Sequence, residues 1–243
     1  MSVQDTMSAL KKAGSAQTRK TYARHGASEP MFGVSFATLK TLYKRIRVDQ
    51  ELAEALWRTG NLDARNLAVK IADPASISSR ELDHWAATPT ARMCGGYVAH
   101  LAAESPHGRA KADKWLAASD DSTRSTAWSL VAAMAMIDES MADSWFVERL
   151  AQIEKSIHSA PNAHRYLMNQ ALISIGGRNT SLRKSAAAAA KRIGTVEVDQ
   201  GDTDCKTPDA LEYIEKCWAR AKSGGFESPA AHERSRESMR TRC

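Results

Sequence analysis

Apolar residues recur every three or four positions along most of this chain, which is the spacing of an amphipathic helix, whereas alternating patterns typical of strands are nearly absent. Ser35, for example, precedes Phe36, Leu39, Leu42 and Ile46, which fall on one helical face. Serine or aspartate stands before many such patterns and glycine or proline follows them, as at helix ends. We expect about twelve helices between residues 3 and 194, joined by short turns.

A regular series of short amphipathic helices favours an α-solenoid, in which helix pairs stack on their neighbours. No sequence repeat is visible, so an irregular helical domain is the alternative. The pattern predicts a helical repeat domain over residues 1–194, a polar linker over 195–206 and a further helix over 207–222. Residues 223–243 are rich in Gly, Ser and charge, so we expect disorder there. The arginines of this tail could add affinity for DNA, or the tail could have no role.

The net charge of +6 and the pI near 9.2 favour a polyanionic partner such as nucleic acid, with solubility alone as the alternative. The chain has no long apolar run and no signal-peptide pattern, so we expect a cytoplasmic protein without a membrane span. The spacing of its four cysteines and seven histidines fits no zinc pattern. We therefore expect free thiols, no metal and no cofactor.

The resemblance to known proteins is carried by five stretches, residues 23–46, 51–74, 83–85, 91–106 and 168–179. Taken in order, these stretches resemble the AlkD-type DNA alkylation repair family. The resemblance covers about residues 3–194 and implies an all-α, HEAT-like solenoid of stacked antiparallel helix pairs, with a basic concave face that holds duplex DNA. It also implies that active members remove N3- and N7-alkylated purines without a metal, using a carboxylate to stabilise the electron-poor sugar.

The positions that would carry this chemistry do not match the family pattern. The catalytic aspartate falls on Gly95, and the two active-site tryptophans fall on Ala91 and Gln170. Asp83 and Glu104 flank the motif, but neither falls at a position from which it could replace the missing carboxylate. Losing one such group typically costs about 10²–10³ in rate. We therefore expect no catalytic residue and no glycosylase activity, with an enzyme that has relocated its catalytic residues as the alternative.

Phosphate contacts require lysine or arginine on one face, and they supply most sequence-independent affinity for DNA. We expect a monomeric module that binds duplex, damaged or branched DNA. A helical scaffold that binds proteins is the alternative, and for each single cation a merely solvated surface position is the alternative. Four candidates lie in or beside the segments that face DNA in the family, and three share one side of a predicted helix: Arg92, Arg124, Arg165 and Arg178, and Lys40, Lys44 and Arg47.

Overall fold

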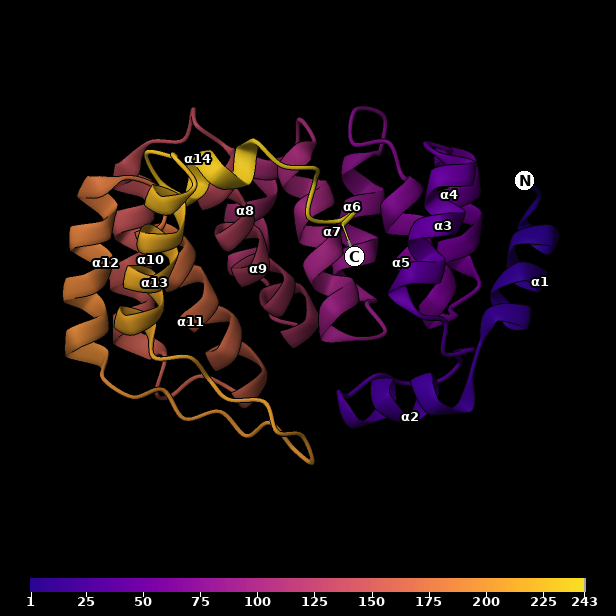
Figure 1. Cartoon of the computed structure of the whole chain (residues 1–243), viewed down its shortest axis with the longest axis horizontal. Helices are drawn as coiled ribbons and strands as arrows, with labels where there is room; N and C mark the ends of the chain where they lie inside the picture. Colours follow the sequence, from indigo (N-terminus) through magenta and orange to yellow (C-terminus); the bar gives the residue numbers. More distant parts are fainter. Residues whose placement is uncertain (243) are drawn as a thin grey trace. The chain divides into compact units, whose positions relative to one another are not determined.

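The computed structural model describes residues 1–242, and within them helices are the only regular secondary structure, with no strand. Figure 1 shows the succession of helices. The all-α prediction is confirmed. The helices are α1 (Val3–Ala13), α2 (Ala16–Arg24), α3 (Phe36–Ile46), α4 (Gln50–Arg58), α5 (Leu62–Ile71), α6 (Ser79–Ala87), α7 (Arg92–Glu104), α8 (Gly108–Leu116), α9 (Asp121–Ile137), α10 (Asp143–Ser156), α11 (Asn162–Gly176), α12 (Thr180–Ile193), α13 (Ala210–Ser223) and α14 (Pro229–Arg234).

The helix starts are set by side-chain caps. At most of the N-termini, a side-chain oxygen accepts a hydrogen bond from the backbone N–H three residues later, which satisfies a donor that the helix itself leaves unpaired. The helix start predicted after Ser35 is confirmed. In the first unit of the chain, such capping residues include Ser2, Ser15, Ser35, Asp49 and Ser78.

The chain divides into two compact units, and the first contains residues 1–111 together with 201–203 and the C-terminal residues from 238. Its central helix is α5, which packs against α1, α3, α4 and α7 and buries every residue except Arg65. Trp57 and Trp85 stack with ring centroids 4.4 Å apart and are almost completely buried. Such an aromatic pair stabilises a core by about 0.5–1.5 kcal/mol beyond its area burial. Both tryptophans belong to the core of this unit.

Helix α2 differs from the other helices of this unit because none of its residues is buried. In Figure 1 it lies apart from α3, α4 and α5. The Tyr22 hydroxyl donates to the Val34 carbonyl at 2.7 Å, and Ser15 N donates to the Gly33 carbonyl at 3.0 Å. Gly33 has φ +78°, and a Cβ there would lie 2.5 Å from the Ser15 carbonyl oxygen, so only glycine allows this close approach. The loop before α3 therefore holds α2 in place while its polar side remains exposed.

The second unit contains residues 112–200 and 204–237. In it α9 packs against α11 and α14, while α12 packs against α10, α11 and α13. The Trp218 indole N–H of α13 donates to the Gly176 carbonyl at 2.8 Å and joins α13 to the end of α11. Trp115 and Trp128 are buried in the core of this unit.

The expectation of a disordered tail over residues 223–243 is wrong for the residues that the structure describes. Helix α14 begins at Pro229, and both Pro229 and Ala230 are buried. Ala230 N donates to the Gly177 carbonyl at 3.0 Å, and the Arg234 guanidinium donates to the Met136 carbonyl at 3.3 Å. For Cys243 the expectation lies outside the described residues. Composition did not reveal this order because polar contacts with residues distant in sequence hold the segment in place.

The last residues pack against the first unit in the same way. Arg240 is only 6% exposed, and its Nε donates to the Glu104 carboxylate at 2.7 Å. Its Nη1 donates to the carbonyls of Val69 and Lys70 at 3.0 and 2.9 Å, near the C-terminus of α5 where the helix dipole favours a cation. The buried Lys70 ammonium donates in return to the carbonyls of Arg240 and Arg242. Charge-assisted hydrogen bonds thus replace apolar burial in this segment.

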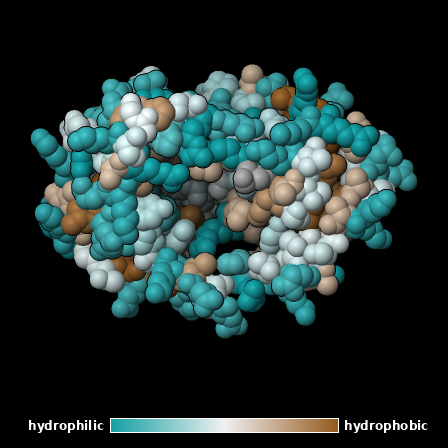
Figure 2. All heavy atoms as spheres, viewed as in Figure 1, coloured by the Kyte–Doolittle hydropathy of each residue, from teal (hydrophilic) through white to brown (hydrophobic). Residues whose placement is uncertain are grey.

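Hydrophilic residues cover most of the face seen in Figure 2, and hydrophobic residues form only small patches among them. Within the described residues, every helix is too short or too polar to cross a membrane.

Candidate nucleic-acid interface

The family's catalytic positions carry no carboxylate in this structure. Ala91 is the N-cap residue of α7 and provides no side-chain cap, and Gly95 is buried within that helix. Gln170 is half-buried on α11, in the second unit. None of the three side chains can carry the negative charge that stabilises an oxocarbenium-like sugar.

The two carboxylates that flank the motif in sequence are held by structural partners. Asp83 forms an ion pair with the buried Lys111 ammonium at 2.7 Å. Glu104 pairs with the Arg240 guanidinium and also accepts a hydrogen bond from the Ser238 hydroxyl. Both groups therefore stabilise the first unit.

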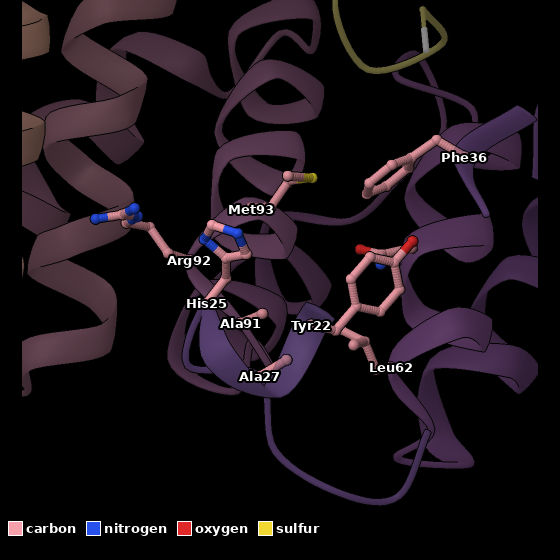
Figure 3. A pocket seen from close by; sticks show the side chains of 9 residues that line it. Tyr22, His25, Ala27, Phe36, Leu62, Ala91, Arg92 and Met93 are labelled. Carbon is pink, nitrogen blue, oxygen red and sulfur yellow. The ribbon is translucent and has the colours of Figure 1, made fainter. Parts of the chain in front are cut away.

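An open pocket of about 150 Å³ lies beside the start of α7, within the first unit. In Figure 3, Tyr22 and Phe36 form one side of it, and His25 and Met93 lie opposite. The rings of Tyr22 and Phe36 are 5.7 Å apart at an interplanar angle of 48°. His25 and Met93 are exposed at the rim, whereas Leu62 is buried. We call this the aromatic pocket, and none of its described lining residues is acidic; the others are Ala27, Asn66, Ala91 and Arg92.

Asn66 gives the aromatic pocket a buried polar group. It is 2% exposed, and its Oδ1 has no hydrogen-bond partner among the described residues. An unpaired buried acceptor typically costs about 1–3 kcal/mol. Sequence reasoning did not single out Asn66, because α5 also carries Asp63, Arg65 and Lys70 and so gives no signal for one polar residue.

Positive charge is concentrated in residues 15–47, which we call the basic segment. It contains seven lysines and arginines against one acid, Glu29, so its net charge of +6 equals that of the whole chain. Glu29 pairs with Arg19 at 2.6 Å. The other cations are largely exposed: Lys20, Arg24, Lys40, Lys44, Arg45 and Arg47, of which only Lys40 is half-buried.

Two of the predicted cations lie on α3 beyond Phe36, which lines the aromatic pocket. Phe36, Lys40 and Lys44 follow each other at intervals of four, so they share one side of the helix. Arg47 is the C-cap residue that follows α3, and its φ of +64° is a conformation that favours glycine. Lys44 and Arg47 are exposed. The structure therefore places Lys40 and Lys44 on the same side of α3 as one residue of the pocket.

Arg178 does not fit the prediction of a phosphate contact. It is 8% exposed, and its guanidinium donates to the carbonyls of Met134 and Ala135 at the end of α9. It also donates to the carbonyls of Glu139 and Met141 in the following loop. Sequence could not show this, because the accepting carbonyls lie about forty residues away and only the fold brings them together. Arg178 stabilises the second unit.

The remaining predicted cations have mixed environments. Arg165 donates to the Ala160 carbonyl at 2.8 Å and to the Glu197 carbonyl at 3.4 Å, and so binds the chain that follows α12. Arg124 pairs with Asp121 at 3.1 Å in the first turn of α9. Arg92 is exposed, and in Figure 3 its guanidinium points away from the other labelled side chains. Only Arg92 of these three lies in the same unit as the basic segment.

Within residues 1–242, no group of three His, Cys, Asp or Glu side chains is arranged to hold a metal ion. Cys94, Cys205 and Cys217 are free thiols, and Cys243 lies outside the described residues. Burial raises the pKa of the Cys94 thiol to about 12. This thiol is therefore neutral near pH 7 and is a poor nucleophile.

Known proteins resemble this chain over most of its length. The Listeria innocua protein Lin0241 is 29% identical over 206 residues, which are 82% of this chain and 89% of that protein. The Listeria monocytogenes protein Lmo0209 is 28% identical over 212 residues, covering 84% of this chain and 92% of its own. Both are similar to this chain without indicating a function for it.

One similar solved structure also comes with a description of what its protein binds. It has a TM-score of 0.84 and 32% identity, and the match covers 93% of this chain and 97% of the other. That protein is described as a member of a new family related to the HEAT-like repeat DNA glycosylases, with affinity for branched DNA structures. The predicted HEAT-like fold is thereby confirmed. The family model for DNA alkylation repair enzymes matches residues 6–214. The chain thus belongs to the DNA alkylation repair enzyme family.

Proposed function

We propose that this protein binds branched DNA through phosphate contacts made by the basic segment, and that it does not cleave the glycosidic bond. The observation that carries the proposal is the concentration of the chain's entire net charge in residues 15–47. The affinity of the similar solved protein for branched DNA supports the choice of ligand.

The physical basis is the release of counterions from the phosphate backbone. Each exposed cation that reaches a phosphate contributes sequence-independent affinity. A branch point brings the backbones of several strands close together, which raises the local density of negative charge. A dense group of cations then gains more from a branched structure than from a linear duplex. The exposure of α2 and of one side of α3 makes these cations accessible.

Paired substitutions test the role of the basic segment. Lys44→Ala with Arg47→Ala should weaken binding to a fluorescently labelled four-way junction by about tenfold at low salt. The matched control is Arg58→Ala with Arg80→Ala, which removes two exposed cations of the same unit from α4 and α6 and should change affinity by less than about twofold. Equal losses for the two pairs would contradict the assignment. A wild-type protein that binds no DNA at low salt would instead favour a protein-binding scaffold.

The proposed lack of glycosylase activity rests on the missing carboxylate. Gly95 replaces the catalytic aspartate, while Asp83 and Glu104 are engaged by Lys111 and Arg240. Release of 3-methyladenine and 7-methylguanine from alkylated duplex DNA should equal the spontaneous rate, measured in single turnover with protein in excess. Release well above the no-protein control would overturn this part of the proposal.

A further inference from the structure

We propose that the aromatic pocket receives one unpaired nucleobase from the branched DNA and that Asn66 hydrogen-bonds to the edge of that base. This inference rests on the proposed DNA binding. It extends that proposal by assigning a second contact with DNA, in which the protein recognises a base and not a phosphate. The pocket, the buried amide and the neighbouring cations are independent observations that point to the same ligand.

The dimensions and lining of the pocket suit a flat aromatic ring. Its volume of about 150 Å³ is far above the roughly 10–15 Å³ that one water requires on the same measure. Tyr22 and Phe36 offer aromatic surface on one side, and stacking on such side chains is tolerant of base identity. Met93 stands opposite and is 51% exposed, which is unusual for a large apolar side chain. A base between Phe36 and Met93 would cover this exposed apolar surface.

The buried amide of Asn66 excludes a purely apolar ligand. An aliphatic group would leave Oδ1 without a hydrogen-bond partner, which is unfavourable. A base with an exocyclic amine instead provides the N–H that Oδ1 lacks. Adenine fits best, because an asparagine carboxamide can accept from its N6 amine and donate to its N7 at the same time. Guanine places two acceptors, O6 and N7, at the corresponding edge, so a guanine that enters by that edge would leave Oδ1 unpaired.

The surroundings of the pocket bring DNA to it. Phe36 begins the side of α3 that continues with Lys40 and Lys44, and Arg47 follows the last residue of this helix. Arg24 is the last residue of α2 and precedes the rim residue His25. A strand whose phosphates contact these cations passes the open side of the pocket. Its unpaired base can then turn inward at a branch point, where little pairing energy has to be lost.

The fold holds the receiving aromatic wall in place before binding. The Tyr22 hydroxyl donates a hydrogen bond to the Val34 carbonyl, which fixes the Tyr22 ring although α2 buries no residue. Asn66 lies on α5, the central helix of the first unit, and is 2% exposed. A preformed site of this kind loses little conformational entropy when a base enters.

The test compares two three-way junctions that differ at one unpaired position at the branch, which carries adenine in one and a tetrahydrofuran abasic analogue in the other. The wild-type protein should bind the adenine junction about tenfold more tightly, as expected for one stacked base. A junction with an unpaired guanine at the same position should bind with an affinity between those of the adenine and abasic junctions. Equal affinity for the adenine and abasic junctions would overturn the inference while leaving the proposed binding of branched DNA intact. Absence of binding to either junction would instead refute the proposed function.

Substitutions in the aromatic pocket test whether the unpaired base binds there. Asn66→Leu and Phe36→Ala should each reduce the adenine-to-abasic ratio to below about threefold. Phe36 is only half-buried, so its variant tests the pocket even if the change at Asn66 prevents folding. Tyr213→Ala removes an exposed aromatic side chain from α13 in the second unit and is the matched control, whose ratio should equal that of the wild type. A tenfold ratio that survives both pocket variants would place the base elsewhere and refute the assignment.

Discussion

Replacing Arg178 with alanine should destabilise the second unit strongly and leave DNA binding by the folded protein unchanged. The guanidinium donates to four backbone carbonyls, lies 3.4 Å from the Asp143 carboxylate and stacks over the Phe146 ring at 4.6 Å. Hydrogen bonds that involve a charged group contribute about 1.5–3 kcal/mol each, but bonds within one network are not additive. Removing the arginine also takes its donor away from the Ala135 carbonyl, whereas the Met134 carbonyl still accepts from the Asp138 N–H. We expect a loss of about 3–5 kcal/mol in the free energy of unfolding.

Thermal unfolding followed by circular dichroism measures this loss. For a chain of this size, it should lower Tm by roughly 10 °C. Arg178→Lys keeps the charge but lacks the planar fork that reaches several carbonyls, so it should cost about half as much. Lys184→Ala, at an exposed position of α12 in the same unit, is the control and should change stability by less than about 0.5 kcal/mol.

The contrary result would be a variant as stable as the wild type that binds DNA less tightly, with a salt dependence reduced by about one phosphate contact. Arg178 would then contact DNA, as its sequence context suggested, and the buried arrangement described above would not be the one present in solution.

Three further substitutions or treatments test separate parts of the structure. Arg240→Ala should lower the free energy of unfolding by about 2–4 kcal/mol in urea titrations, because Glu104 and two carbonyls of α5 lose a buried partner; an unchanged midpoint would refute the packing of the C-terminal residues. Arg47→Gly should raise Tm by about 2–4 °C because glycine relieves the positive φ, and it should also weaken junction binding because a cation is lost. Either effect without the other would contradict this account of Arg47. Cys94 should resist iodoacetamide at pH 8 in the native protein and react after unfolding, because burial raises the pKa of its thiol to about 12; alkylation in the native state, mapped by mass spectrometry, would contradict its burial.

The helices could be predicted from sequence because their signals are local. A cap such as Ser35 and the apolar spacing that follows it act within one or two turns, and the structure places α3 at Phe36–Ile46 accordingly. The same holds for the core tryptophans, since each lies on the apolar face of its own helix.

Features that depend on distant residues could not be predicted in this way. Arg240 looks like part of a polar tail, and its burial depends on Glu104, which lies 136 positions earlier in the chain. The aromatic pocket likewise joins Tyr22, Phe36, Asn66 and Met93 from four different helices. The motif comparison predicted Gly95 at the position of the family's aspartate, but it gave no indication of the aromatic pocket.

The salt dependence of junction binding tests the central claim most directly. The dissociation constant for a four-way junction should be measured between low and physiological salt for the wild type and for a variant with alanine at Lys20, Arg24, Lys44 and Arg47. Each lost phosphate contact lowers the slope of log affinity against log salt by about 0.9. If these side chains of the basic segment contact phosphates, the slope for the variant should be shallower by about three to four. An equal slope for the two proteins, with the variant folded, would show that DNA does not bind to this face.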